Sequence, residues 1–229
     1  MSGATEYYSG VAAEFHRSYE ADPNRLDRLT VWRKVLDRYA GGCGLAYDLG
    51  CGSGMITREL ALRVPRVIAI DGAAGMLAIA SQTLSHVGVT NVEFLEACFP
   101  LPDNSGLLPA QLVISSSALE YTDSLPDSLA FAASLLLPRG ALIFSMSNRR
   151  SISRNIVRQV HRTCGKPAYL DHLRHFVTVQ ELQSHLPAAH LEYVEHAFFG
   201  GADWMNRFLA LLAPTSRTSN MILMVARRT

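Results

Sequence analysis

The sequence predicts an α/β protein built on a mostly parallel sheet with helices on both faces. Short apolar runs that suit buried strands alternate with longer helical segments along most of the chain, as expected when a crossover helix follows each strand. The first apolar run, residues 45–49, leads into a glycine-rich turn, and the second, residues 66–71, ends in Asp71. With 229 residues, 48% of them hydrophobic, the chain has the length and apolar content of one domain, residues 1–229.

The bulk composition excludes several classes of protein. A formal net charge of +1 gives no reason to expect a nucleic-acid partner. The four cysteines are scattered without a Cys-x-x-Cys pair, which suits a reducing cytosol and argues against a structural zinc site. The chain opens without the pattern of a signal peptide, and its longest apolar run, within residues 129–137, is too short to span a bilayer. We therefore expect a cytoplasmic protein.

Three glycines at alternate positions follow the first strand. Gly50, Gly52 and Gly54 come directly after Asp48 and Leu49, and a helix can start after them. Glycine tolerates a positive φ and lets a ligand lie against bare backbone, while the amides that open a helix favour a negatively charged group. Asp71 lies 21 residues after Gly50, a separation at which an acid can bind both hydroxyls of a ribose. These features predict a nucleotide-type cofactor.

The spacing distinguishes between cofactor classes. A dinucleotide fingerprint requires Gly-x-Gly-x-x-Gly, and Met55 occupies its third glycine position, which argues against a nucleotide-linked dehydrogenase. The pattern Asp-x-Gly-x-Gly-x-Gly instead resembles the first motif of class I methyltransferases that depend on S-adenosyl-L-methionine (SAM). This resemblance implies a Rossmann-like, seven-stranded sheet, SAM as cofactor and S-adenosyl-L-homocysteine as product. It also implies that the glycine turn packs on the methionine part of SAM, with Asp48 near its ammonium group.

Two further segments carry the resemblance, and each departs from it. Residues 71–77 resemble the family's Asp-x-Ser-x-x-Met-Leu, in which Met76 would pack on the adenine; a core methionine is the alternative. In the segment before Leu101 and Pro102, Ala97 stands where the family usually has the Asp that binds the adenine amino group. Losing that hydrogen bond costs about 1 kcal/mol if the amino group still reaches water. The family also often has Asp where Gln111 stands.

The resemblance assigns the cofactor to the carboxyl ends of the first four strands. Backbone groups of Ala97 and Cys98 and the ring of Phe99 are expected to meet the adenine. The full set of expected cofactor-binding residues is Asp48, Gly50, Cys51, Gly52, Gly54, Asp71, Gly72, Met76, Ala97, Cys98, Phe99, Ser115 and Ser116.

The remaining elements follow in order from the apolar patterns and the turn residues. Strands are expected at residues 45–49, 66–71, 92–97, 111–116, 141–144, 190–199 and 220–226, and helices at residues 54–63, 73–86, 123–137, 178–186 and 203–212. The turn before the fifth strand resembles the family's Leu-x-Pro-Gly-Gly, with Arg139 where a glycine is usual. By resemblance, the last strand inserts antiparallel.

Residues 1–40 are expected to form a helical cap with a break at residues 22–24, where Pro23 interrupts the pattern. Many small-molecule methyltransferases have a similar aromatic opening that folds over the active site. By that resemblance Tyr8, Phe15 and Tyr19 line the substrate pocket. The alternative is that these rings only attach the added helices to the sheet.

Residues 117–121 resemble a turn that some quinone-pathway O-methyltransferases use to hold a metal with acids and a histidine. Because Ser117 and Tyr121 occupy two of those positions, we expect no metal here, and we place Tyr121 next to the substrate. Glu120 either caps the following helix or contacts the substrate.

Residues 148–177 occupy the place where this family inserts a substrate lid. Arg150, Arg154, Arg158 and Arg162 recur every four residues, and no Asp or Glu occurs in residues 149–170. On a helix this spacing gives one basic stripe, which is either a solvated face or a binding surface. Its anionic partner would be a phosphorylated or carboxylated substrate, an acidic carrier protein or a membrane surface. We assign Arg150 and Arg154 to substrate binding.

Two histidines follow the stripe. His175, and less strongly His172, are candidate general bases because a histidine can take a proton from a hydroxyl at neutral pH; ordinary surface roles are the alternative. We therefore predict a methyltransferase that transfers a methyl group from SAM to a small-molecule hydroxyl. N-methylation of a small amine and a SAM-binding protein without activity remain alternatives.

Overall fold

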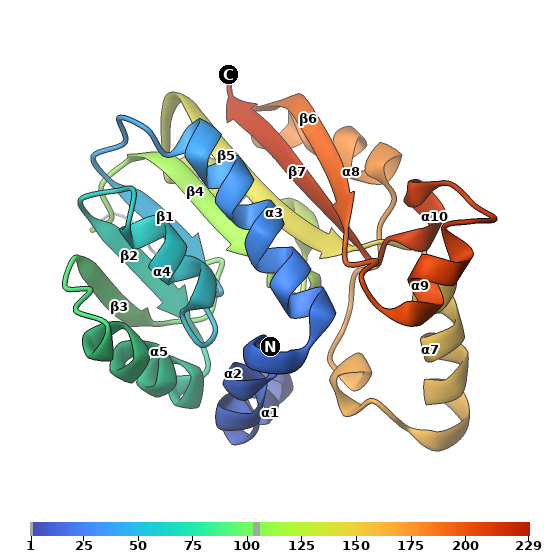
Figure 1. Cartoon of the computed structure of the whole chain (residues 1–229). Coiled ribbons are helices and arrows are strands. Elements are labelled where there is room, and N and C mark those ends of the chain that lie inside the picture. The colour runs from blue at the N-terminus through green and yellow to red at the C-terminus, as the bar shows by residue number, and fades with distance from the viewer. Residues whose placement is uncertain (1, 103–105) are drawn as a thin grey trace.

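The computed structural model describes residues 2–102 and 106–229, and it contains one seven-stranded sheet in the order β3-β2-β1-β4-β5-β7-β6 (Figure 1). Its strands are β1 (Ala46–Leu49), β2 (Val67–Asp71), β3 (Val92–Glu96), β4 (Ala110–Ser116), β5 (Leu136–Ser147), β6 (Leu191–Phe199) and β7 (Met221–Arg228). The first five strands are parallel, and β7 pairs antiparallel with both β5 and β6. The predicted fold class, including the antiparallel last strand, is confirmed.

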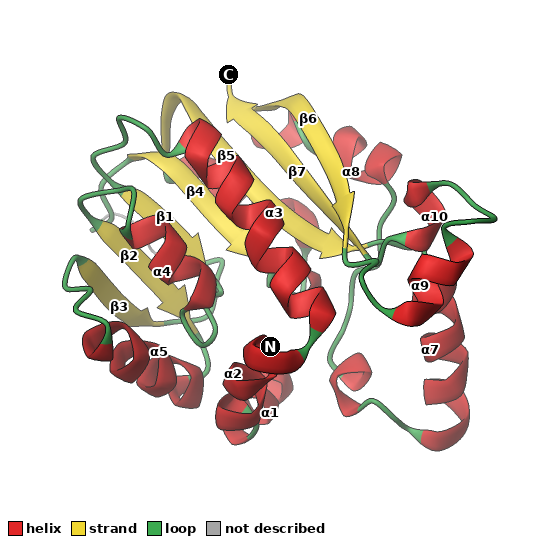
Figure 2. Ribbon diagram, viewed as in Figure 1, coloured by secondary structure: helices red, strands yellow, loops and turns green. Residues whose placement is uncertain are grey.

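Helices cover both faces of this sheet (Figure 2). The helices are α1 (Ser2–Gly10), α2 (Ala12–Ala21), α3 (Pro23–Tyr39), α4 (Met55–Ala61), α5 (Ala74–His86), α6 (Leu125–Ser134), α7 (Ile152–Cys164), α8 (Val179–His185), α9 (Trp204–Leu209) and α10 (Thr215–Thr218). Short 3-10 turns lie at η1 (Leu119–Tyr121), η2 (Ala168–Asp171) and η3 (Pro187–Ala189). Among the described residues, no helix is both long and apolar enough to cross a membrane.

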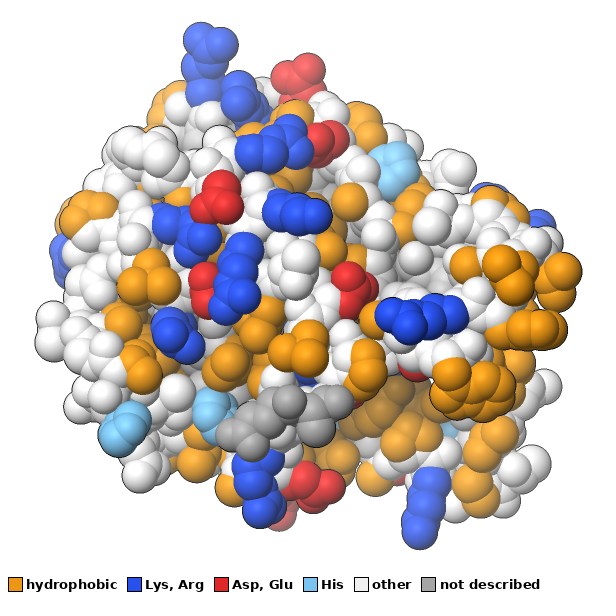
Figure 3. Space-filling view, viewed as in Figure 1, with side chains coloured by type: hydrophobic (Ala, Val, Ile, Leu, Met, Phe, Trp, Pro, Cys, Tyr) orange, Lys and Arg blue, Asp and Glu red, His pale blue; other side chains and the backbone are white. Residues whose placement is uncertain are grey.

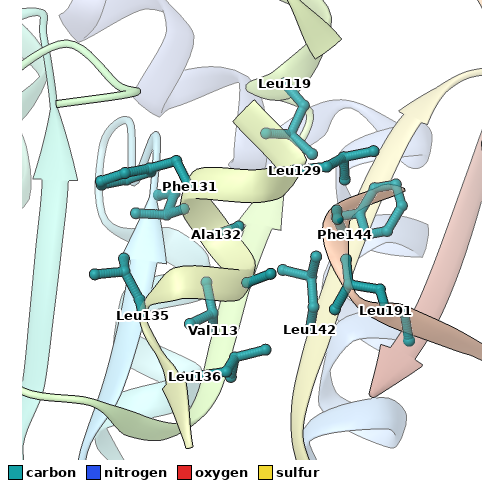
Figure 4. Close-up of a cluster of buried hydrophobic side chains, with 14 of the residues drawn as sticks. Val113, Leu119, Leu129, Phe131, Ala132, Leu135, Leu136, Leu142, Phe144 and Leu191 are labelled. Carbon is teal, nitrogen blue, oxygen red and sulfur yellow. The ribbon is translucent and has the colours of Figure 1, made fainter. Parts of the chain in front are cut away.

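The strands are apolar because both faces of the sheet are buried. In β4, Leu112 and Ile114 pack in the cluster formed with α3 and α4, whereas Val113 faces the cluster formed with α6 and α8. Figure 4 shows Leu129 of α6 beside Leu119 and beside Phe144 of β5 in this second cluster, and all three side chains are fully buried. This two-sided core holds the carboxyl ends of the strands in place.

The expected break in the N-terminal helices is present at Asp22. Its carboxylate accepts a hydrogen bond from the Asn24 amide (2.9 Å), and Pro23 is the first residue of α3, an arrangement that favours a new helix start. A second break at Val11 separates α1 from α2. Figure 1 shows α1 and α2 at the end of the sheet where the arrowheads of β1, β2 and β4 lie.

The helix expected over residues 123–137 is shorter than the pattern indicated. It ends at Ser134, and Leu136 pairs with Ala110 of β4 across an irregular register. Pro138 disfavours helical geometry in the residue before it, so these residues join the sheet. Arg139 in the following turn has φ of 65°, which explains why a glycine is usual at this position.

Candidate active site

A cavity of about 620 Å³ opens at the carboxyl ends of β1, β2 and β4. In the strand order, the chain runs outward from β1 through β2 to β3 and then returns to β4 on the other side. Ligands of open α/β sheets bind at such a reversal point. The half of the cavity at the glycine turn, here called the turn half, is lined by Asp48, Gly50, Cys51, Gly52, Ser53, Asp71, Gly72, Ala73, Met76, Ala97, Cys98, Phe99 and Ser116.

Gly50 and Gly52 serve different purposes in the turn. Both have a positive φ, 73° and 53°. A Cβ on Gly50 would lie 2.1 Å from the Cβ of Ala118, whereas a Cβ on Gly52 would meet nothing closer than the Phe15 ring at 3.9 Å. Gly50 therefore permits close packing of the next loop, and Gly52 leaves bare backbone facing the cavity.

Asp71 is fixed by the backbone around it. Its Oδ2 accepts a hydrogen bond from the Gly52 amide (2.8 Å) and its Oδ1 from the Ala73 amide (2.8 Å). Burial raises the pKa of Asp71, while the surrounding amides oppose that rise. The carboxylate is thus held at the end of β2 with lone pairs left for a ligand's hydroxyl groups.

Asp48 carries an unsatisfied oxygen at the cavity wall. Its Oδ2 accepts a hydrogen bond from Thr57 Oγ1 (2.7 Å), but Oδ1 is buried without a partner. Burial raises the pKa of Asp48 to about 7. Ser53 Oγ and Ser116 Oγ are likewise buried without partners among the described residues. Because unpaired buried polar atoms are costly, this wall suits a polar ligand with a cationic group.

The apolar part of the turn half is formed by Met76 and Phe99, which are 2% and 5% exposed. Ala97 and Cys98 lie beside them, and the Ala97 amide already donates to the Asp71 carbonyl (3.1 Å). Of the backbone groups expected to meet the adenine here, the Ala97 amide is therefore used within the protein, whereas the expected contact of the Ala97 carbonyl stays a prediction.

Two of the expected cofactor residues lie outside the cavity lining. The hydroxyl of Ser115 donates to the Leu49 carbonyl (2.8 Å) inside the sheet. Gly54 packs on α5, since a Cβ there would come within 2.9 Å of both the Ala80 Cβ and the Leu84 Cδ1. Gln111 is also remote, because its side chain accepts from the amides of residues 44 and 45 at the opposite end of the sheet.

The second half of the cavity, here called the far half, is formed by aromatic and charged side chains. Its lining includes Tyr8, Phe15, Tyr19, Asn24, Arg25, Arg28, Glu120, Tyr121, Arg154, Val157, Tyr169, Met205 and Asn220. The Tyr8 and Tyr121 hydroxyls are 2.6 Å apart, and their rings meet edge to face. Burial raises the pKa of both phenols, so both remain neutral, and one hydroxyl donates to the other.

Glu120 is buried in the far half. Its Oε2 accepts a hydrogen bond from the Ser147 amide (2.6 Å), and its side chain is 2% exposed. Burial raises its pKa, while Arg154, the Ser147 amide and Arg28 oppose the rise. Ser124, rather than Glu120, caps the following helix by accepting from the Asp127 amide (3.3 Å).

Three arginines reach the far half from two elements. Arg25 and Arg28 extend from α3, and Arg154 extends from α7. The Arg25 guanidinium lies 4.0 Å from the centre of the Phe15 ring, and Arg154 donates to the Tyr169 hydroxyl (2.7 Å). The Nε of Arg154 is buried without a partner in the described chain. Arg25 and Arg28 were not predicted as site residues, because the sequence marks them by nothing more than their shared face on α3.

The basic stripe does not act as one surface. Arg154 alone of its four members lines the cavity. Arg158 lies over the Phe176 ring (4.2 Å), Arg162 donates to Gln159, and Arg150 is exposed outside the cavity. The expected substrate contact of Arg150 is therefore not part of this site.

Neither candidate base lies in the cavity lining. His175 Nε2 donates to the Thr122 carbonyl (2.9 Å), and His172 packs against the Tyr7 ring, with ring centres 5.0 Å apart. The path of residues 165–178 places His175 against the η1 segment and His172 against α1. In the described residues, no group of three His, Cys, Asp or Glu is placed to hold a metal ion.

Comparisons with known proteins agree with this geometry. Residues 47–144 match the family model described as a methyltransferase domain. The chain is 32% identical, over 72% of its length, to trans-aconitate 2-methyltransferase of Streptomyces avermitilis. The chain belongs to the class I SAM-dependent methyltransferases. The predicted family and cofactor are thereby confirmed, and the turn half, with its orphaned Asp48 oxygen and bare Gly52 backbone, fits SAM.

Two further comparisons define the extent of the likeness. The chain is 31% identical, over 61% of its length, to a ubiquinone biosynthesis O-methyltransferase of Chromobacterium violaceum. It spans 61% and 57% of the lengths of these two curated relatives. Magnesium protoporphyrin IX methyltransferase of Synechocystis PCC 6803, solved with bound S-adenosylhomocysteine, has the same fold, with a TM-score of 0.71, 15% identity and coverage of 98% of this chain and 97% of that one.

Proposed function

We propose that this chain transfers the methyl group of SAM to an oxygen atom of a small-molecule acceptor that carries an anionic group. The observation that carries the proposal is the meeting of Arg25, Arg28 and Arg154 with Glu120 in the far half of the cavity. None of the three arginines has an acidic partner within 4.0 Å among the described side chains. Guanidinium groups bind carboxylates and phosphates through charge-assisted, paired hydrogen bonds.

The turn half would hold the cofactor. Asp48 Oδ1 would pair with its ammonium group, Asp71 would accept from its ribose hydroxyls, and Met76 and Phe99 would enclose its adenine. The Cys98 amide is the remaining backbone donor next to the adenine, since the Ala97 amide is already used. When bound, SAM supplies a methyl carbon that its positively charged sulfur has already activated, so the chain's main task is alignment.

Glu120 would accept the proton of a hydroxyl acceptor. Burial raises the pKa of Glu120, and a carboxylate with a raised pKa is a stronger base toward a hydroxyl proton. The neutral phenols of Tyr8 and Tyr121 would hold the acceptor oxygen in line with the methyl group. We also propose that residues 1–40 and 148–177 act as cap and lid, because both segments contribute lining residues and together exclude water.

Calorimetric titration tests the cofactor half. Wild type should bind SAM and S-adenosylhomocysteine, and Asp71→Asn should weaken both by about tenfold or more, because a hydrogen bond to a charged group is lost at each hydroxyl. Asp37→Asn is the matched control, since Asp37 pairs with Arg63 away from the cavity. Absence of SAM binding by wild type would overturn the proposal.

An acceptor panel with labelled SAM tests the far half. Hydroxylated carboxylates and phosphates should react, their neutral esters should react poorly, and Arg154→Gln should raise KM for the anionic acceptors. Arg150→Gln is the control, because Arg150 lies outside the cavity. Methylation of neutral amines in preference to anionic hydroxyl compounds, or an equal KM in both variants, would contradict the assignment even if SAM binds tightly.

A further inference from the structure

Large apolar side chains project from α9 and the turn that follows it. Trp204, Phe208, Leu211 and Leu212 are 82%, 60%, 80% and 75% exposed. Figure 3 shows hydrophobic side chains gathered on the right of the view, where Figure 1 places α9 and α10. Isolated exposed apolar residues are ordinary, but a group of this kind marks a surface that contacts something other than water.

Basic residues outnumber acidic ones around this group. The helices α7 and α9 both contact α10, and we call these three helices, with residues 210–214, the docking lobe. Residues 149–170 and 204–219 contain no Asp or Glu. The exposed cations of these segments are Arg149, Arg150, Arg162, Lys166, Arg207 and Arg217, and Ile156 and Val160 of α7 add apolar surface.

The nearby acids all have partners, and Glu181 pairs with Arg149 (2.5 Å). Asp203 accepts from the Asn206 amide (2.9 Å), from the Asn206 side chain (2.7 Å) and from Asn24 (3.1 Å). Asp171 lies 3.1 Å from His161. These three acids are fewer than the six exposed cations, so the face that presents Trp204 and Phe208 to solvent has a net positive charge.

We propose that the docking lobe binds the surface of an anionic lipid bilayer, with Trp204, Phe208 and Leu211 inserted among the headgroups. Aromatic and aliphatic side chains beside arginines match the layered chemistry of a membrane interface, and cations near anionic lipids add further attraction. A second copy fits less well, because a symmetric contact would place Arg207 and Arg217 near their own counterparts. The inference does not depend on the acceptor proposed above.

Docking on a bilayer would also place the cavity next to the membrane surface. Val157 of α7 and Met205 of α9 belong to the far half of the cavity. The helices that contact the bilayer would therefore also form a wall of the acceptor site. An acceptor that resides at the membrane surface would then reach the cavity without crossing bulk water.

Vesicle binding provides the test, with the full chain and no acceptor present. The probes are phosphatidylcholine vesicles with and without phosphatidylglycerol, followed by cosedimentation. The chain contains two tryptophans, of which Trp32 is fully buried, so a blue shift of emission reports on Trp204. Wild type should sediment with the anionic vesicles, shift its emission to the blue and be released by salt.

Two variants locate the contact. Phe208→Ser/Leu211→Ser should weaken partitioning by about tenfold or more for each side chain withdrawn from the interface, and Arg207→Gln/Arg217→Gln by about fivefold for each charge. Leu26→Ser/Leu62→Ser and Lys34→Gln/Arg58→Gln make matched changes elsewhere on the surface and should leave partitioning unchanged. Circular dichroism and SAM titration check that each variant is folded.

The proposal has clear contrary outcomes. It fails if wild type ignores anionic vesicles, or if the Phe208→Ser/Leu211→Ser variant partitions as wild type does. It also fails if light scattering shows that wild type is a dimer and that this variant is a monomer. The docking lobe would then bind a second copy of the chain. Binding to an acidic carrier protein but not to vesicles would overturn it in the same way.

Discussion

Thr57 donates a hydrogen bond of 2.7 Å to one carboxylate oxygen of Asp48, and the other oxygen of Asp48 has no partner among residues 2–102 and 106–229. Thr57 extends from the first helix after the glycine turn, so the start of α4 fixes the acid at the end of β1. Burying the charged carboxylate with one oxygen unpaired costs free energy in the ligand-free protein. The stability of that protein should therefore depend on whether Asp48 is ionised.

The first prediction concerns pH. Burial raises the pKa of Asp48 from 3.8 to about 7, so folded protein holds a proton there that unfolded protein has released. The free energy of unfolding of SAM-free protein should therefore be highest below pH 3.8 for this group, and its contribution should be lost as pH rises toward 7. Denaturant titrations across this range should show a smaller decline in Asp48→Asn; an equal decline would contradict the assignment. The pKa values of Asp71 and Glu120 are also raised, so the free energy of unfolding of Asp48→Asn should still decline somewhat with pH.

A second prediction separates the glycines of the turn. Gly54→Ala should destabilise the fold by about 1–3 kcal/mol, because the new Cβ would meet Ala80 and Leu84 at a residue with φ of 80°. Gly52→Ala should lose less stability, since its Cβ enters open space, but it should weaken SAM binding more. Thermal melts measure the stability of both variants, and calorimetry measures their SAM binding. If Gly52→Ala is the less stable variant and Gly54→Ala binds SAM less well, the prediction is wrong.

A third prediction concerns the turn before β5. Arg139 has φ of 65°, a conformation that costs a residue with a side chain roughly 1 kcal/mol. Arg139→Gly should therefore raise the free energy of unfolding by a fraction of that amount, because glycine is also more flexible when unfolded. Arg58→Gly, inside α4, should instead lower it by about 1 kcal/mol. If Arg139→Gly is less stable than wild type, the Arg139 side chain makes a contact that stabilises the fold by more than the backbone strain costs.

The fourth prediction concerns proton transfer. Glu120→Gln should lower kcat for a hydroxyl acceptor by about a hundredfold or more and should remove the acidic limb of the pH–rate profile. Glutamine can still accept from the Ser147 amide, so the fold should persist. His175→Ala should leave kcat and the profile unchanged, because the ring bonds to a backbone carbonyl. A lost acidic limb in His175→Ala would restore the histidine as the base.

The sheet was predictable because it is buried on both faces. Strands such as β1 and β2 leave uninterrupted apolar runs, and Asp22 with Pro23 marks a helix start by local chemistry alone. The pairing of Leu136 with Ala110 was not predictable, since it depends on contacts between distant residues. The break at Val11 has no proline signal either.

The site residues also divide into those that a local sequence motif marks and those that only the packing of the fold brings to the cavity. Asp48, Gly52 and Asp71 belong to a local motif, and the structure places all three at the cavity. Arg25 and Arg28 come from a helix whose position is set by packing on the sheet, so no sequence pattern marks them. The two histidines were chosen for their chemistry alone, and the path of residues 165–178 carries them elsewhere.

The two halves of the cavity draw on different stretches of the chain. The turn half comes from residues 48–116, whereas most of the far half comes from residues 8–28 and 154–221. If the turn half holds SAM and the far half holds the acceptor, as we propose, exchange of these outer stretches between related chains would change the acceptor while the cofactor site is kept. For an engineer, the outer stretches would be the exchangeable part of the chain and residues 48–116 the constant part.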